Sequence, residues 1–180
     1  ARGAAVTLVS TVSLPTPAGV ELIAVETAAQ MQSAMETHAA DSDVVVMAAA
    51  VADFRPAVAA GGKLKKRDGV PEIVLEPTPD ILAFLGEAKP AGQVLVGFAA
   101  ETDDLLANAT AKLATKRLDL IVANDVGAPQ VGFAHDTNAV TLLRPDAKPV
   151  EIDLADKRDV ARAVINTIVE IRATTQAGKH

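Results

Sequence analysis

The sequence predicts a three-layer α/β sandwich with a mainly parallel sheet, because it contains three long apolar runs that alternate with helical segments. The runs cover residues 44–54, 94–102 and 118–127, and each ends in a short polar signature. Continuous runs of Val, Ile, Leu and Ala are typical of parallel strands that are buried on both faces. Helices between such strands cover the two faces of the sheet, which gives the three layers.

The first half of the chain is expected to hold four strands and one helix. Aliphatic residues predict the strands, at residues 4–10, 20–25, 43–50 and 72–75. Residues 11–19 contain two prolines and a glycine and are expected to form a loop. Thr27 is the expected N-cap of a helix that reaches about His38. Residues 52–71 are expected to be irregular.

The second half continues the alternation of strands and helices. Strands are predicted at residues 93–98, 118–123, 139–143 and 149–152, the last two as a hairpin or a pair of edge strands. Helices are predicted at residues 79–87, 102–116 and 156–172. Thr78 is the expected N-cap of the first of these helices, with Pro79 at its first position. Residues 173–180 are expected to be a frayed tail.

The composition limits the class of protein. A chain of 180 residues, 49% of them hydrophobic, is expected to form one domain, residues 1–180. The absence of cysteine excludes disulfides and thiolate chemistry, and a count of three histidines argues against a His-rich metal site. The net charge of −6 and the lack of Trp and Tyr argue against a nucleic-acid partner. No apolar run reaches the ~20 residues that cross a bilayer, and no signal peptide is visible. We therefore expect a cytoplasmic protein with no membrane partner.

The three polar signatures are expected to meet at one edge of the sheet. In an open α/β sheet, ligands bind outside the carboxyl ends of the strands. Four side chains stand at or near the ends of the runs: Asp53, Phe98, Asn124 and Asp125. We expect them to face one crevice.

A basic loop lies between the first two runs. Residues 61–69 read GGKLKKRDG, with three Lys and one Arg among three Gly. Such an arm can fold over a triphosphate and offset its charge, and a solvated surface loop is the alternative. Asp53 precedes this loop and is a candidate Mg²⁺ ligand shared with nucleotide phosphates, or else a turn cap.

Two helix features are candidates for the same site. Lys112 and Lys116 lie one turn apart on a helix, so they either reach the phosphates or complement the helix C-terminus. Residues 78–81 present helix N-terminal N–H groups that can bind an anion or a base edge, or form an ordinary cap. The chain contains no GxGxxG, GxxxxGK[ST] or GxSxG motif, which argues against ordinary NAD binding, a P-loop and a nucleophile elbow. Together these features favour a nucleoside-triphosphate site.

Several segments together resemble the phosphopantothenate–cysteine ligase family. They are AAAVADFRP, GKLKK, PTPDIL, VGFAAET, and LDLIVANDVG followed by GFAHDTNAVTLL. The resemblance runs from about residue 1 to residue 171, in the family's order and spacing. It implies a Rossmann-like, CTP-dependent ligase of coenzyme A biosynthesis, often fused in bacteria behind a flavin-dependent decarboxylase. FMN is expected only if such a decarboxylase is fused upstream.

The reaction implied by the resemblance has two steps. CTP activates the carboxylate of 4′-phosphopantothenate as an acyl-cytidylate and releases pyrophosphate, with Mg²⁺ as the expected cofactor. The amine of cysteine then attacks the acyl carbon and releases CMP. The resemblance also implies a homodimer with the site near the subunit boundary, and residues 139–153 are our candidates for the dimer strands.

The resemblance assigns roles to ten residues. Lys63 matches the family's essential loop lysine and is the expected catalytic residue. Asp53 matches the acidic residue near the metal and the triphosphate. The remaining matches are to nucleotide-binding positions: the small pair Ala49 and Ala50, the base-and-sugar segment Pro79, Asp80 and Ile81, the aromatic Phe98, and the triphosphate-binding Lys112 and Lys116.

The sequence departs from the family pattern at its start. The family begins with a strand, a glycine-rich turn and a segment that carries a catalytic Asn, and this sequence starts after them, so we expect an N-terminally truncated domain. Without that segment, nucleotide binding is expected to survive and the second half-reaction to suffer. Two alternatives stay open: a non-catalytic, nucleotide-binding and dimerising fragment of the enzyme, and a Rossmann-type oxidoreductase, which the absent glycine fingerprint disfavours.

Overall fold

The computed structural model describes residues 3–13, 15–58, 62, 72–101, 104–125, 135–145 and 147–177. The chain divides into two compact units. The first unit consists of Ala1–Ala34 and Ala50–Ile81, and the second of Met35–Ala49 and Leu82–His180. The expectation of a single domain over residues 1–180 stays a prediction.

The first unit begins with a parallel strand pair. Strand β1 (Val6–Ser10) pairs with β2 (Val20–Ala24) along their whole length. Helix α1 (Ala28–Ala39) follows, and its start is fixed by reciprocal hydrogen bonds. The Gln30 N–H donates to Thr27 Oγ1 at 3.2 Å, and the Thr27 N–H donates to Gln30 Oε1 at 3.0 Å. This capping box confirms the predicted N-cap at Thr27.

A short antiparallel ladder forms the rest of the first unit. Strands β4 (Phe54–Pro56) and β5 (Leu75–Pro77) pair, with Arg55 opposite Glu76. Arg55 Nε donates to Glu76 Oε1 at 2.7 Å. The sequence predicted no strand at residues 54–56 and placed the second strand at 72–75, so both predictions were wrong. Three-residue strands that end in proline lack an alternating pattern, and their pairing depends on a partner about 20 residues away.

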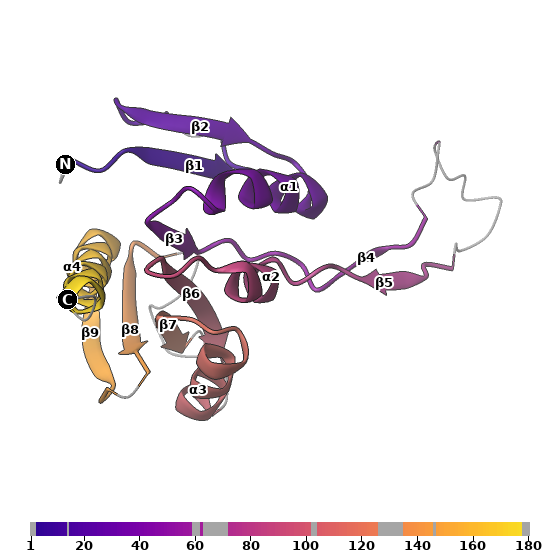
Figure 1. Cartoon of the computed structure of the whole chain (residues 1–180). Helices are drawn as coiled ribbons and strands as arrows, with labels where there is room; N and C mark the ends of the chain where they lie inside the picture. The colour runs from indigo at the N-terminus through magenta and orange to yellow at the C-terminus, as the bar shows by residue number, and fades with distance from the viewer. Residues whose placement is uncertain are drawn as a thin grey trace. The chain divides into compact units, whose positions relative to one another are not determined.

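The second unit contains a five-stranded sheet in the order β3-β6-β7-β8-β9 (Figure 1). Its strands are β3 (Val44–Met47), β6 (Val94–Glu101), β7 (Leu120–Asp125), β8 (Thr137–Leu143) and β9 (Val150–Asp156). The pairs β3–β6 and β6–β7 are parallel, whereas β7–β8 and β8–β9 are antiparallel. The predicted parallel strands and the predicted edge hairpin are therefore confirmed.

Helices cover both faces of this sheet. Helix α4 (Lys157–Ala177) packs Val160, Val164 and Ile168 onto one face, against alternate residues of β6, β7 and β8. Helix α3 (Leu105–Thr115) contacts β6 and β7 on the other face, where Leu95 and Ile121 are buried. Helix α2 (Ile81–Ala88) belongs to the same face, since a methyl of Leu82 lies close to Gly97 of β6. Successive strand residues point to opposite faces, so the two sets of core residues are distinct. The predicted three-layer α/β fold is confirmed.

Several element ends differ from the predicted ones. Helix α4 continues to Ala177, so the frayed tail predicted from residue 173 was wrong for its first five residues. The hydroxyls of Thr174 and Thr175 donate to the carbonyls of Glu170 and Ile171, each at 3.0 Å, within this last turn. Helix α2 begins at Ile81, so Pro79 precedes it instead of occupying its first position. None of the described helices has the length and apolar character needed to cross a membrane.

Candidate functional site

The carboxyl ends of β3, β6 and β7 lie at the same edge of the five-stranded sheet. Met47 of β3 is opposite Gly97 of β6, and Ala100 of β6 is opposite Asn124 of β7. Because these three strands are parallel neighbours, their carboxyl ends share one edge. We call this the carboxyl edge, and it confirms that the three strand ends are neighbours. The crevice expected for Asp53, Phe98, Asn124 and Asp125 stays a prediction, because Asp53 belongs to the first unit.

Phe98 presents an aromatic surface at the carboxyl edge. It follows Val94 and Val96 at alternate positions of β6, and these two are buried in the core under α4. Phe98 itself is 40% exposed. Its position is set by its neighbour Gly97, where a Cβ would lie 2.8 Å from a methyl of Leu118 and 2.9 Å from a methyl of Leu82. The site therefore has a half-exposed aromatic ring on a tightly packed strand.

Helix α3 starts at the carboxyl edge and runs to the opposite edge. It follows β6 and ends where the Asp119 N–H donates to the Leu95 carbonyl, at the start of β6 and β7. At about 1.5 Å per residue, Lys112 lies about 10 Å and Lys116 about 16 Å along the axis from the first residue of α3. Long side chains on a helix point back towards its N-terminus, so Lys112 is the better placed of the two to approach the carboxyl edge.

Both ends of α3 have non-glycine residues in the left-handed region. Asp104 precedes the helix with φ 44° and makes no side-chain capping bond, and Arg117 follows it with φ 51°. At the C-terminal end, Leu118 N–H donates to Leu113 O at 2.9 Å and Arg117 N–H to Ala114 O at 3.1 Å. This is a Schellman ending in which arginine occupies the position that glycine favours.

In the first unit, a second group of predicted residues comes together. The Thr78 N–H donates to the Asp53 carbonyl at 2.8 Å, immediately beyond the β4–β5 ladder. This bond brings Asp53 next to the Thr-Pro-Asp-Ile segment, although 25 positions separate them in sequence. Asp53, Pro79 and Asp80 are exposed, whereas Ile81 is buried at the start of α2.

The predicted site residues thus form two groups, one in each unit. The first unit holds Ala50, Asp53, Pro79, Asp80 and Ile81, and the second holds Ala49, Phe98, Lys112 and Lys116. Lys63 lies outside the described residues, as does the rest of the basic loop except Gly62. The side chain of Asp125 is also outside them.

The donor set suits a magnesium ion that is bound chiefly through phosphate. Within the described parts of the chain, no group of three or more His, Asp or Glu residues could hold a metal. Asp53 is an exposed carboxylate. Mg²⁺ is commonly held by one or two carboxylates and completes its shell with water and substrate phosphates. Asp53 fits that role when a nucleotide supplies the other oxygens.

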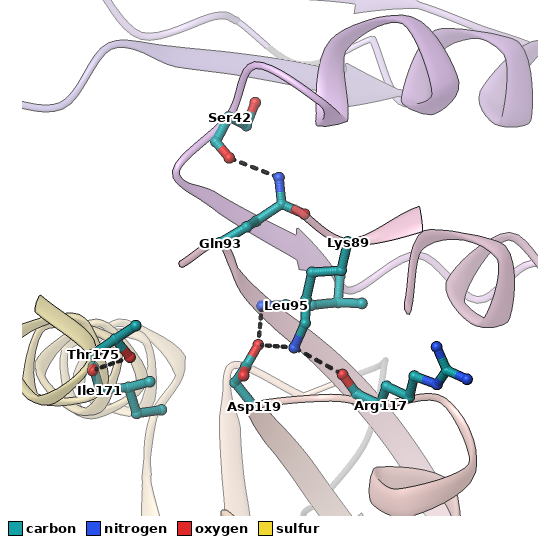
Figure 2. Close-up of polar contacts among 8 residues, drawn as sticks. All are labelled: Ser42, Lys89, Gln93, Leu95, Arg117, Asp119, Ile171 and Thr175. Atoms are coloured by element: carbon teal, nitrogen blue, oxygen red, sulfur yellow. Dashed lines mark hydrogen bonds and ion pairs between the residues drawn. The ribbon is translucent and has the colours of Figure 1, made fainter. Parts of the chain in front are cut away.

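Sequence reasoning missed the polar contacts at the opposite edge of the sheet. Lys89 and Asp119 form an ion pair of 2.8 Å there, shown with its neighbours in Figure 2. Asp119 stands between Leu118 and Leu120, directly before β7, and a charged residue within an apolar run is the signal that could have identified it.

The fold and the strand-end residues define an α/β protein with a candidate ligand site at the carboxyl ends of parallel strands. The chain belongs to the family described as the DNA/pantothenate metabolism flavoprotein C-terminal domain, whose profile matches residues 1–171. The family resemblance predicted from the motifs is thereby confirmed.

Relatives with known names agree with this assignment. The chain is 46% identical over 175 residues to the coenzyme A biosynthesis bifunctional protein CoaBC of Bacillus subtilis, which covers 96% of this chain and 43% of that protein. It is 41% identical over 173 residues to a cysteine/cysteine sulfinic acid decarboxylase from an unknown prokaryotic organism, covering 95% of this chain and 48% of that protein. The chain therefore spans less than half the length of these curated relatives.

Solved structures share the fold. The crystal structure of the C-terminal domain of a CoaBC protein superposes with a TM-score of 0.75 at 40% identity, covering 92% of this chain and 74% of that chain. A Cab2 mutant in complex with phosphopantothenate-cysteine gives a TM-score of 0.69 at 21% identity, covering 89% and 55%. The second similarity concerns the fold alone.

Proposed function

We propose that this chain is a ligase domain that joins 4′-phosphopantothenate to cysteine through an acyl-cytidylate formed from CTP. The observation that carries the proposal is the 46% identity to a bifunctional coenzyme A biosynthesis protein over 96% of the chain. The complex of a Cab2 mutant with phosphopantothenate-cysteine supports it further, because that protein shares the fold and holds the product of such a ligation.

The proposed reaction has two steps. In the first, one phosphorus–oxygen bond forms and another breaks; in the second, an amide bond forms and an acyl carbon–oxygen bond breaks. A carboxylate oxygen of 4′-phosphopantothenate attacks the α-phosphorus of CTP, and pyrophosphate leaves. The neutral amine of cysteine attacks the acyl carbon, the carbon–oxygen bond to CMP breaks, and the amine loses a proton. Both steps develop negative charge on phosphate oxygens, so cationic groups near those oxygens lower the barriers.

The two groups of residues divide the proposed work. Asp53 would hold Mg²⁺ together with the nucleotide phosphates, and the metal would neutralise phosphate charge. Pro79, Asp80 and Ile81 would contact the base and sugar, while Phe98 would line the carboxyl edge. Lys63 of the basic loop, together with Lys112 and Lys116, would supply positive charge near the triphosphate. Ala49 and Ala50 would let the ligand approach the backbone closely.

A homodimer built on the edge hairpin is part of the proposal. Strand β9 is at the edge of the five-stranded sheet, and Val150 and Leu154 on it are exposed. An open edge with exposed apolar residues favours pairing with another chain. Sedimentation of the chain, with Leu154→Lys as the variant, tests whether residues 139–153 form the contact.

Nucleotide-dependent stabilisation tests the function. The unfolding temperature is measured with CTP, ATP and NAD, each with and without Mg²⁺. A ligand present at 100 times its Kd stabilises the folded state by about 2.7 kcal/mol, so the expected shift with CTP and Mg²⁺ is readily measured. Stabilisation by NAD alone would contradict the proposal.

Pyrophosphate release separates an enzyme from a binding fragment. The chain is incubated with CTP, Mg²⁺ and 4′-phosphopantothenate, with and without cysteine, and pyrophosphate and CMP are measured. Release of both is expected for the ligase. CTP binding without pyrophosphate release would favour the non-catalytic fragment.

A further inference from the structure

The C-terminal end of α3 rests directly against α2 at Gly86. A Cβ placed on Gly86 would lie 1.9 Å from the carbonyl oxygen of Lys116 and 2.9 Å from its carbonyl carbon. Both atoms are backbone, so no side-chain rotation relieves the overlap. Any larger residue at position 86 must displace the end of α3 that follows Lys112.

Lys89 ties the same end of α3 to the sheet. Its ammonium donates to the Arg117 carbonyl at 3.0 Å and to Asp119 Oδ2 at 2.8 Å. Asp119 Oδ2 also accepts the Leu95 N–H at 2.7 Å, so one carboxylate joins α2, the turn after α3 and the start of β6 (Figure 2). We call Gly86, Lys89 and Asp119 the α3 seat.

The ion pair in the α3 seat is largely shielded from solvent. The side chains of Lys89 and Asp119 are 20% and 26% exposed. Removing Lys89 leaves a half-buried carboxylate and the Arg117 carbonyl without this donor, and such a loss costs more than breaking a surface pair. Arg117 has a left-handed backbone conformation, which is strained for a non-glycine residue. Once its carbonyl loses the bond to Lys89, we expect the turn to change its backbone conformation.

We propose that Gly86 and Lys89 are positioning residues for the nucleotide site, because they fix the end of α3 that carries Lys112 and Lys116. The inference rests on the proposed function, in which these lysines bind the triphosphate. An 11-residue helix tilts largely as one body, so a shift at its end moves the lysines on it. A misplacement of about 1 Å by a substitution far from the chemistry can cost up to ~100-fold in activity.

Neither positioning residue is placed to touch the nucleotide itself. Gly86 and Lys89 lie at the C-terminal end of α2 and just beyond it, beside the amino ends of β6 and β7. The carboxyl edge is at the other end of those strands. An effect on CTP is therefore indirect, and α3 is the element that joins these two residues to the triphosphate lysines.

Lys89→Met is the variant that tests the inference, with Gln93→Met as its matched control. Buried Gln93 donates to Ala39 O at 2.6 Å and Ser42 O at 2.7 Å, so its loss weakens the same edge of the sheet without touching α3. CTP affinity with Mg²⁺ is measured by titration calorimetry, and the unfolding temperature by circular dichroism. We expect both variants to unfold earlier, but only Lys89→Met to bind CTP about tenfold more weakly.

Steady-state kinetics separate positioning from general destabilisation, because only a positioning role predicts a change in KM that is specific to CTP. Lys89→Met is expected to raise the KM for CTP and to leave the KM for 4′-phosphopantothenate within a factor of two. In a background that carries Lys112→Met and Lys116→Met, the effect of Lys89→Met on CTP affinity is expected to vanish, because coupled residues are not additive. If Lys89→Met does not fold, Gly86→Ala takes its place in the same measurements.

Two results would overturn the inference. One is a CTP affinity in Lys89→Met equal to that of the unsubstituted chain. The other is an equal loss of affinity in Lys89→Met and Gln93→Met, which would reveal general destabilisation. Absence of CTP binding by the unsubstituted chain would instead refute the proposed function, and this inference with it.

Discussion

The two edges of the five-stranded sheet are built in opposite ways. The end of the sheet opposite the carboxyl edge, where β6 and β7 begin, is the amino edge. There, backbone and side-chain groups bond one another: Val94 N–H to Asp43 O, Asp119 N–H to Leu95 O, and Lys89 to Asp119. At the carboxyl edge, Ala49, Phe98 and Ala100 are exposed. One end of each strand is thus closed by the protein, while the other leaves surface for a ligand. The comparison indicates where substitutions will change stability and where they will change binding.

The largest expected effect is a loss of stability on substitution of a buried residue near the amino edge. Leu95→Ala removes a side chain that is 0% exposed and should lower the free energy of unfolding by about 2–5 kcal/mol. Val46→Ala is the matched control, since Val46 is 46% exposed on the neighbouring strand and should cost less than about 1 kcal/mol. Urea unfolding followed by circular dichroism measures both, because the chain has no Trp or Tyr for fluorescence. Equal losses of stability in Leu95→Ala and Val46→Ala would contradict the difference in burial between the two side chains.

Breaking the amino-edge ion pair should come next. Asp119→Ala removes the carboxylate that accepts from the Lys89 ammonium and the Leu95 N–H, and a loss of about 2 kcal/mol is expected after allowance for partial exposure. Arg162→Ala removes an exposed ion pair with Asp159 and should change stability by less than about 0.5 kcal/mol. A loss in Asp119→Ala no larger than this control would mean that the amino edge is not closed by Lys89 and Asp119.

At the carboxyl edge, the expected change is in binding. Phe98→Ala should weaken CTP binding about tenfold, equivalent to about 1.4 kcal/mol, because a ring beside a base or sugar contributes on that scale. Phe84 on α2 has almost the same exposure, 41% against 40%, so Phe84→Ala controls for the loss of one exposed ring. Calorimetric titration with CTP should detect the loss in Phe98→Ala alone.

The smallest expected effect is a gain of stability. Arg117→Gly removes the cost of a left-handed arginine and should stabilise the chain by about 0.5–1 kcal/mol, after the larger unfolded-state entropy of glycine is counted. Ala114→Gly, inside the same helix, should destabilise by about 1 kcal/mol. If both substitutions destabilise equally, the turn after α3 is not strained.

Much of the fold could be predicted because its strands are long apolar runs. Residues 94–97 and 120–123 are buried on both faces, so composition alone identified their strands as parallel ones. The ladder between Phe54 and Pro77 could not be predicted, since it depends on pairing between short segments that are far apart in sequence.

The candidate site was only partly predictable. Polar residues after parallel strands indicated the carboxyl edge, and the motifs indicated which residues belong to it. The contact between Lys89 and Asp119 joins residues that are 30 positions apart. Asp119 stands out within its apolar run, but nothing in the local sequence identifies Lys89 as its partner. The close approach of Gly86 to Lys116 likewise follows from helix packing, which local sequence does not encode.

The hydrogen bond from the Leu95 N–H to the Asp119 carboxylate makes that amide a probe for hydrogen exchange. The Leu95 nitrogen lies 2.7 Å from Asp119 Oδ2, and the Leu95 side chain is fully buried, so its N–H should exchange with solvent only when this part of the sheet unfolds. Its exchange rate in deuterated buffer would report the opening of the amino edge residue by residue. Ligand added at the carboxyl edge should slow that exchange only by stabilising the whole second unit, so one amide would report whether the two edges are energetically linked.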